Sequence, residues 1–292
     1  MDARSKRRGA LWIALAANAV LMAAEIAGGF AFRSLALLTD AVHLLTDVSG
    51  LAIALLAIGL QARPITERHT FGLQRAEVLA AQANAFILIA VTIWIAVEAV
   101  QRLITPVDVR GAGLAIVAGG GLVVNLACAR LLHEVAGRSL NMRGAFLHVA
   151  LDAAGSLAAL VAGLAIVLWD VPRVDPVVSL LIGSLVLWAA WRLLVDTTHV
   201  LLEGTPEGLD AAGVERAIVD HDGVEGVHHL HLWSLASDVP ALSAHVVLRG
   251  EMSLHDAQVR GEGVKAMLAE RFGIDHATLE LECHRDHPEP EF

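Results

Sequence analysis

Long apolar segments dominate the first two thirds of this chain and constrain its fold more than any other feature. A helix needs about 20 predominantly apolar residues to cross the hydrocarbon core of a bilayer. Six segments meet that requirement: Leu11–Phe32, Leu35–Leu60, Val78–Ile104, Gly111–Leu132, Ala145–Trp169 and Pro176–Val195. The sequence therefore predicts an all-α bundle of six transmembrane helices over residues 1–204.

The composition changes after residue 204. The chain as a whole is 56% hydrophobic, above the ordinary range of soluble domains, and the excess lies almost entirely before this point. The remainder shows helix and strand patterns in alternation: a helix over Leu209–His221, strands over Val227–Leu235 and Leu242–Arg249, a helix over Leu254–Phe272 and a strand over Ala277–Glu282. This α-β-β-α-β order predicts a small α+β domain with an antiparallel sheet over residues 205–292.

Basic residues are distributed unevenly among the connections between the apolar segments. They gather before the first segment, between the second and third, and between the fourth and fifth: Arg4, Lys6, Arg7 and Arg8; Arg63, Arg68 and Arg75; Arg130, Arg138 and Arg143. Since Lys and Arg favour the cytoplasmic side, we expect both termini in the cytoplasm and the helices in a bacterial inner membrane. The last third is acidic and the net charge is −10, which argues against nucleic acid as a partner and is compatible with attracting cations.

Ionisable residues inside two of the apolar segments repeat one spacing. The second segment contains His43 and Asp47, and the fifth contains His148 and Asp152, each pair four residues apart. Residues at this spacing share one face of a helix. One such pair is explained equally well by a helix-stabilising contact, but two identical pairs in membrane helices favour a functional site. Asp40 lies on the same stripe as His43, either as a further ligand or as a residue that orients one.

Two imidazoles and two carboxylates from two helices can supply the four ligands of a tetrahedral metal site. Nitrogen and oxygen ligands in that geometry suit zinc, whereas magnesium and calcium prefer oxygen alone and copper(I) prefers sulfur. Cobalt and cadmium fit such a site less well but are not separated from zinc by affinity order alone. The four residues predict a transport site for a divalent transition metal, with Zn²⁺ as the first choice.

Further stretches of the chain carry a family resemblance. They are Ser34–His43, Phe71–Glu77, Leu201–Pro206 and Val227–Trp233. Together with the paired His-x-x-x-Asp, these stretches resemble the cation diffusion facilitator family of zinc/proton antiporters. The resemblance implies six transmembrane helices, a ferredoxin-like, metallochaperone-like cytoplasmic domain, and a homodimer in the lipid bilayer. His43 stands where some members carry Asp, which resembles the more zinc-selective branch.

The resemblance also implies a second metal site in the C-terminal domain. His228, His245 and Glu282 match metal-binding positions of the family, with His255 as a bridging ligand. Strand alternation places His229 and His231 on the face opposite His228. The alternative is a histidine-rich surface with no specific site.

Three further expectations rest on single residues. Arg75 and Glu203 match a charge pair of relatives that ties the membrane helices to the cytoplasmic domain. His69 is an auxiliary candidate, although its loop lacks the other ligands of a metal site found there in some relatives. Cys283 begins a terminal run that either adds ligands or forms a frayed tail.

The ligands themselves suggest a mechanism. Every candidate ligand is also a proton acceptor, so protons compete with the metal for the same lone pairs. The sequence contains no P-loop and no zincin-type His-Glu-x-x-His motif, so we expect an ion gradient as the energy source and no enzymatic activity. We therefore predict export of zinc in exchange for protons by alternating access. The alternatives are an exporter of cadmium, cobalt or iron(II), a channel, or a membrane-bound metal sensor.

Overall fold

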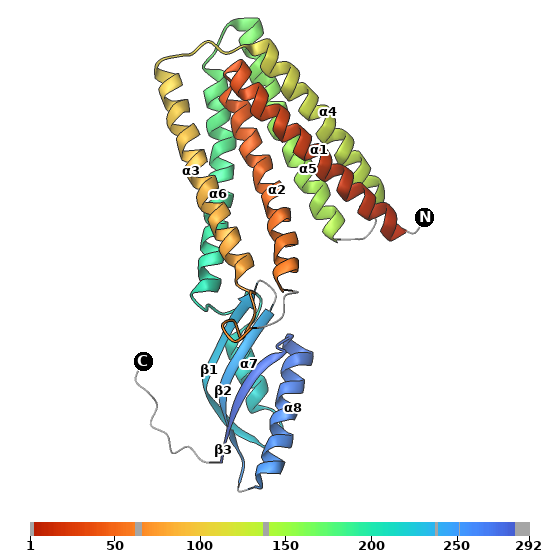
Figure 1. Cartoon of the computed structure of the whole chain (residues 1–292), viewed down its shortest axis with the longest axis vertical. Coiled ribbons are helices and arrows are strands. Elements are labelled where there is room, and N and C mark those ends of the chain that lie inside the picture. Colours follow the sequence, from red (N-terminus) through yellow and green to blue (C-terminus); the bar gives the residue numbers. More distant parts are fainter. Residues whose placement is uncertain (1–2, 62–65, 137–139, 237–238, 251, 284–292) are drawn as a thin grey trace. The chain divides into compact units, whose positions relative to one another are not determined.

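The computed structural model describes the backbone of residues 3–61, 66–136, 140–236, 239–250 and 252–283. Within the helices, the side chains of residues 3–15, 47, 50–52, 54–61, 132–136 and 140–148 are not described. The elements are α1 Ala3–Phe32, α2 Leu35–Gln61, α3 Ala76–Ile104, α4 Gly111–Ala136, α5 Leu140–Trp169, α6 Val174–Leu201, α7 Ala211–Val219, β1 Val224–Ala236, β2 Val239–Leu248, α8 Leu254–Phe272 and β3 His276–Glu282 (Figure 1).

The first six helices correspond to the six apolar segments of the sequence. Within the described residues, four of them are long and apolar enough to cross a membrane: α3, the Gly111–Leu131 part of α4, the Val149–Trp169 part of α5, and α6. The described apolar parts of α1 and α2 are shorter, at Ala16–Phe32 and Leu35–Thr46. The prediction of a helical transmembrane region is therefore confirmed.

Contacts divide the chain into two compact units, residues 1–55 with 83–194 and residues 56–82 with 195–292. In the first unit α4 packs against both α5 and α1 (Figure 1). A Cβ at Gly163 of α5 would lie 2.7 Å from the backbone nitrogen of Ala115 on α4. Glycine is therefore needed for these two helices to approach so closely, as is common between membrane helices.

Polar contacts join α2 to α6 at two levels. Asp175 of α6 accepts hydrogen bonds from the Ser34 hydroxyl (2.5 Å) and from the backbone N–H groups of Leu35 (2.8 Å) and Ala36 (3.2 Å). It thereby caps the N-terminus of α2, where free N–H groups favour an anion. Further along, the hydroxyls of Thr39 and Ser179 lie 2.6 Å apart. These buried contacts fix the position of the helix that carries His43.

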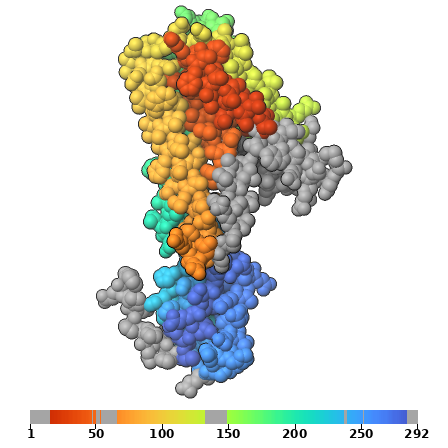
Figure 2. Space-filling model, in the orientation of Figure 1, coloured from red at the N-terminus to blue at the C-terminus, as the bar shows by residue number. Residues whose placement is uncertain are grey.

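Apolar side chains cover the outer faces of the membrane helices. α3, yellow to orange in Figure 2, lies at the surface of the helical unit, and its half-exposed apolar residues are Phe86, Ile87, Ile93, Trp94, Val97 and Val100. A soluble protein rarely exposes such a surface, but hydrocarbon chains solvate it favourably. These residues therefore face lipid.

The sheet of the second unit has the strand order β1-β2-β3 (Figure 1). β1 pairs with β2 antiparallel, whereas β3 pairs with β2 parallel. The α-β-β-α-β order and the α+β class are confirmed, but the prediction of an antiparallel sheet is wrong. α8 provides the crossover that a parallel pair requires, and this crossover returns β3 to run in the same direction as β2.

α7 and α8 share one hydrophobic core with the sheet. Val214 and Ile218 of α7 and Val264 and Leu268 of α8 are fully buried in it. α8 has well-defined ends, because the Ser253 side chain accepts from the Asp256 N–H at its start and Gly273 adopts φ 69° at its end. Glycine takes that left-handed conformation at little cost. The three strands therefore pack against helices that are held in place by the shared core.

Candidate metal sites

His43 of α2 and Asp152 of α5 meet inside the helical region. The Nε2 atom of His43 lies 3.3 Å from Oδ1 of Asp152. The Asp152 side chain is 1% exposed, whereas that of His43 is 31% exposed. The pair is therefore closed on the carboxylate side and accessible on the imidazole side.

The other two residues of the predicted tetrad lie on the same helices. Asp47 follows His43 by one turn on α2, and His148 precedes Asp152 by one turn on α5. Their side chains lie outside the described residues, so convergence of all four stays a prediction. Asp40 is 3% exposed and its Oδ1 lies 3.0 Å from the Cβ position of Gly155, one turn beyond Asp152.

A second cluster lies on the sheet of the other unit. His228 of β1 and His245 of β2 are directly paired across the strands, and Glu282 of β3 reaches both of them. Its Oε2 lies 2.9 Å from Nε2 of His228, and its Oε1 lies 2.8 Å from Nδ1 of His245. Glu280, on the same face of β3, places Oε2 3.4 Å from Nε2 of His245. The structure therefore brings together three of the four cytoplasmic residues implied by the family resemblance.

His229 joins this cluster, against the expectation from strand alternation. Its ring centroid lies 5.0 Å from that of His228 and 4.9 Å from that of His245. The backbone of His229 has φ 50°, and the pairing of β1 with β2 shifts register between His228 and His231. Such a bulge interrupts the two-residue period and redirects a side chain, so the expectation was wrong for His229.

The donor atoms of this cluster suit a borderline metal ion. His228, His229 and His245 form one group, and His245, Glu280 and Glu282 form another, with ligand atoms within 4.8 Å of one another in each. Imidazole nitrogen combined with carboxylate oxygen is the ligand chemistry of zinc. His245 belongs to both groups, so it is the central residue of the cluster.

The charge of Glu282 is controlled by its two histidine partners. Partial burial alone would raise the pKa of this carboxyl group, but the hydrogen bonds and positive charge of His228 and His245 outweigh burial and lower the pKa. Glu282 is therefore ionised at neutral pH. An ionised carboxylate is the form that binds a metal.

The remaining candidates lie outside these groups. His255 is exposed in the first turn of α8, and Cys283 is exposed just after β3. His69 is exposed and makes a turn with Thr66, whose hydroxyl accepts its backbone N–H at 3.2 Å. The roles of these three residues stay predictions.

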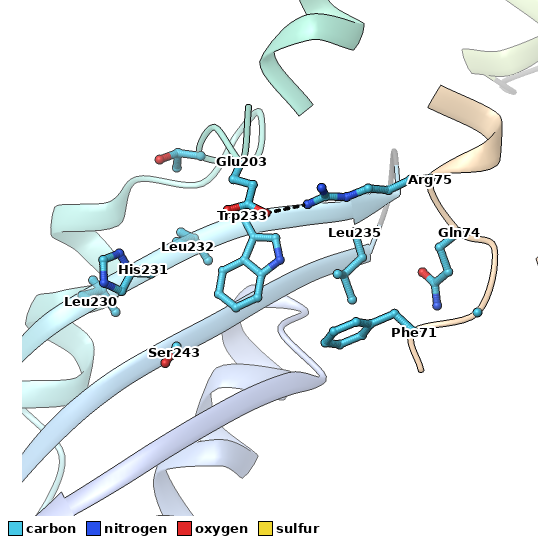
Figure 3. Close-up of a pocket in the computed structure, with 12 residues that line it drawn as sticks. Phe71, Gln74, Arg75, Glu203, Leu230, His231, Leu232, Trp233, Leu235 and Ser243 are labelled. Carbon is cyan, nitrogen blue, oxygen red and sulfur yellow. Dashed lines mark hydrogen bonds and ion pairs between the residues drawn. The ribbon is translucent and has the colours of Figure 1, made fainter. Parts of the chain in front are cut away.

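Arg75 and Glu203 form an ion pair in the second unit, with 3.2 Å between Nη2 and Oε1 (Figure 3). The pair borders a cavity of about 780 Å³, which the sequence did not indicate. Phe71 and Trp233 supply aromatic rings to its lining, and His231 also lines it (Figure 3). Because both charged side chains are solvent-accessible, the pair contributes little stability, roughly 0–1 kcal/mol.

A helical membrane region with a histidine–carboxylate pair, joined to an α+β domain with a histidine–glutamate cluster, defines a membrane transporter of metal cations. The chain belongs to the cation efflux family, the cation diffusion facilitators. The model of the cation efflux transmembrane domain matches residues 11–202, and that of the cation efflux protein cytoplasmic domain matches residues 206–284. The resemblance found in the sequence is therefore confirmed.

Curated relatives match over almost the whole chain. The metal cation efflux system protein CzcD of Cupriavidus metallidurans is 40% identical over 277 residues, 93% of this chain and 85% of that protein. The zinc transporter ZitB of Escherichia coli is 40% identical over 279 residues, 94% and 88% respectively. The cadmium, cobalt and zinc/H⁺–K⁺ antiporter of Bacillus subtilis is 36% identical over 263 residues, 89% and 84%.

A solved structure also matches part of this chain. It is the metal-bound C-terminal domain of the CzcD transporter from Cupriavidus metallidurans, 38% identical, covering 25% of this chain and 99% of that one, with a TM-score of 0.23.

Proposed function

We propose that this protein exports Zn²⁺ from the cytoplasm in exchange for protons by alternating access. The substrate ion binds between α2 and α5, to His43, Asp47, His148 and Asp152. Protons compete for the same imidazole and carboxylate lone pairs, so uptake of protons from one side releases the metal there. The residues thus serve transport rather than catalysis.

One observation carries this proposal: the 3.3 Å separation of His43 Nε2 and Asp152 Oδ1. Zinc binds such atoms at about 2.0–2.2 Å in a tetrahedral arrangement, which separates neighbouring ligand atoms by roughly 3.3–3.5 Å. The two side chains therefore stand at the spacing of two ligands of one zinc ion. Ionisable side chains are costly among apolar membrane helices, which favours a functional role for this pair.

The names of the relatives support both zinc as the transported ion and the coupling of its export to protons. ZitB is named a zinc transporter and the Bacillus protein a cadmium, cobalt and zinc/H⁺–K⁺ antiporter. Imidazole ligands favour zinc over the oxygen-seeking ions. Cadmium, cobalt and iron(II) are the alternative substrates that an exchange assay with each ion distinguishes.

We assign the His228–Glu282 cluster to regulation of transport by bound zinc. Its ligands come from three strands of one domain, so binding a metal ion joins these strands. The cytoplasmic-domain model that matches is named for dimerisation, which supports a homodimer. The acidic composition of the domain would oppose close approach of two copies, and bound Zn²⁺ would reduce that repulsion.

The distribution of basic residues supports a location in the bacterial inner membrane with both termini in the cytoplasm. In that orientation the regulatory domain samples the same compartment from which zinc is removed. The Arg75–Glu203 ion pair is then positioned on the cytoplasmic side, where it would tie the helices to the domain.

Zinc flux into proteoliposomes under an imposed pH gradient tests the proposal. Asp152→Asn keeps the size of the side chain but removes its charge, and should reduce flux by at least 100-fold. Asp170→Asn is the matched control, because Asp170 is exposed at φ 55° and Asn adopts that conformation readily. Normal zinc flux through a folded Asp152→Asn variant would refute the assigned site, and flux that ignores the pH gradient would refute antiport.

A further inference from the structure

The backbone of β1 leaves the extended conformation at His229. Its φ of 50° lies in the left-handed region, which residues other than glycine adopt in only a few per cent of cases. Within β1, β2 and β3 it is the single non-glycine residue with a positive φ. Such a conformation is costly and persists only where the surrounding structure holds it in place. The cost points to a use for the His229 side chain.

The distortion brings the His229 ring to two other imidazoles. In a regular strand it would lie on the face opposite that of His228, but the register shift between His228 and His231 redirects it. The ring centroids of His228 and His229 lie 5.0 Å apart, those of His229 and His245 4.9 Å, and those of His228 and His245 5.0 Å. The three rings therefore form a nearly equilateral triangle.

The nitrogen atoms of this triangle lie close enough to serve one metal ion. One ring nitrogen from each of His228, His229 and His245 lies within 4.8 Å of the other two. Two nitrogen ligands of a tetrahedral zinc ion are separated by roughly 3.3–3.5 Å, so modest side-chain rotations bring the three together. All three residues are half-buried, which holds the rings in position while leaving them accessible to an ion.

A carboxylate lies beside the triangle. The two carboxylate oxygens of Glu282 contact two of its corners, at 2.9 Å from Nε2 of His228 and 2.8 Å from Nδ1 of His245. Three imidazoles and one carboxylate are four nitrogen and oxygen ligands, the number that a tetrahedral zinc site requires. The sheet alone therefore supplies a complete ligand set.

This set differs from the one implied by the family resemblance. That set contains His255 and omits His229. In the structure His255 is exposed in the first turn of α8, and neither group of potential ligands includes it. His229 thus stands among the imidazoles where the resemblance would have placed His255.

We propose that His229 is a metal ligand of the cytoplasmic cluster and that the bulge in β1 serves to place this third imidazole. The site takes a divalent transition metal through His228, His229 and His245, with Glu282 beside them, and does not require His255. A set rich in imidazole favours zinc, cobalt, nickel and copper over magnesium, calcium and manganese, which prefer oxygen ligands. The inference deepens the proposed regulation by zinc and rests on it.

Competition for Zn²⁺ between the full-length protein in detergent and a chromophoric chelator tests the assignment. His245→Asn removes the central ligand and so identifies the zinc held by this cluster. Loss of a group that merely supports a ligand costs about 10–100-fold in affinity, so His229→Asn should weaken the same zinc by at least about 10-fold. His231→Asn is the matched control, because His231 lines the cavity beside Arg75 and belongs to neither ligand group; its zinc affinity should equal that of the wild type.

Thermal unfolding separates a ligand from a residue that only supports the fold. Asparagine adopts the left-handed conformation readily, so the His229→Asn protein should unfold at the wild-type temperature in excess chelator. Added zinc should raise its Tm less than that of the wild type. Co²⁺ in place of Zn²⁺ gives a spectroscopic readout: its visible absorption bands should change in His229→Asn and stay unchanged in His231→Asn.

The outcomes separate the inference from the proposed function. Wild-type zinc affinity and an unaltered Co²⁺ spectrum in His229→Asn would overturn the inference and leave the regulatory cluster intact. A His229→Asn protein destabilised equally with zinc and with chelator would also overturn it, as would a loss of affinity in His255→Asn that His229→Asn does not show. Wild-type zinc binding by His245→Asn would overturn both the inference and the proposed regulation.

Discussion

Replacement of Glu282 by Gln tests the cytoplasmic cluster with a minimal change of shape. The Glu282 side chain is 9% exposed and accepts hydrogen bonds from His228 at 2.9 Å and His245 at 2.8 Å. Glutamine keeps the size of the side chain and one oxygen. Its amide nitrogen, however, replaces the second oxygen, and the negative charge is lost. The variant therefore removes the anionic ligand while preserving packing.

The expected magnitude follows from these contacts. Hydrogen bonds to a charged group contribute about 1.5–3 kcal/mol each and neutral ones about 1 kcal/mol, so the metal-free domain should lose about 1–3 kcal/mol. At a zinc concentration of 1,000 times Kd, binding stabilises the wild type by about 4 kcal/mol. A 100-fold loss of affinity would reduce that stabilisation to about 1.4 kcal/mol. For a domain of this size the difference corresponds to a Tm change of about 10–20 °C.

Thermal unfolding of a fragment spanning residues 205–292, with zinc or with a chelator, measures both effects. Glu262→Gln is the control, because Glu262 is 73% exposed on α8 and its pair with Lys265 lies on the surface, so the zinc-dependent gain in Tm should be unchanged. If zinc raises the Tm of the Glu282→Gln fragment as much as that of the wild type, Glu282 is not a ligand and the reasoning fails.

Three further predictions concern other properties. The histidine partners of Glu282 lower the pKa of its carboxyl group below 4.5. The ionised side chain therefore stabilises the metal-free domain above pH 4.5, and this stabilisation is lost as the pH falls through the lower pKa of the folded state. The wild type should lose more stability on acidification than Glu282→Gln, which urea titrations at a series of pH values would show. His43→Asp makes the transport site richer in oxygen and should raise cadmium or manganese flux relative to zinc severalfold in competition assays, whereas an unchanged ratio would locate selectivity elsewhere. Asp175→Asn should destabilise the full-length protein in detergent by about 1–3 kcal/mol, since the cap of α2 loses its charge, and an unchanged unfolding midpoint would argue against that cap.

Local sequence signals predicted the elements of this fold well. The structure begins and ends α8 at the expected residues, Leu254 and Phe272. The contacts at the two ends of this helix lie within a few residues of its termini, so its bounds can be predicted without tertiary information. The apolar segments likewise predict membrane helices, because bilayer thickness sets their length.

Features that depend on distant residues were harder to predict from the sequence. The direction of β3 relative to β2 depends on where α8 returns the chain, which strand patterns do not encode. The position of His229 depends on a bulge, and the signal that could have indicated it is weak: three histidines within four residues, His228, His229 and His231, interrupt the apolar alternation.

The two-level contact between α2 and α6 has a mechanical consequence. A carboxylate that holds the first turn of α2 and a hydroxyl pair one turn further on resist both sliding and rotation of one helix against the other. During alternating access, α2 and α6 would then move together as a rigid body, and the relative displacement would occur at the contact surface between α2 and α5. His43 and Asp152 lie on opposite sides of that contact surface. The movement would therefore change the distance between these two ligands and, with it, the affinity for the ion.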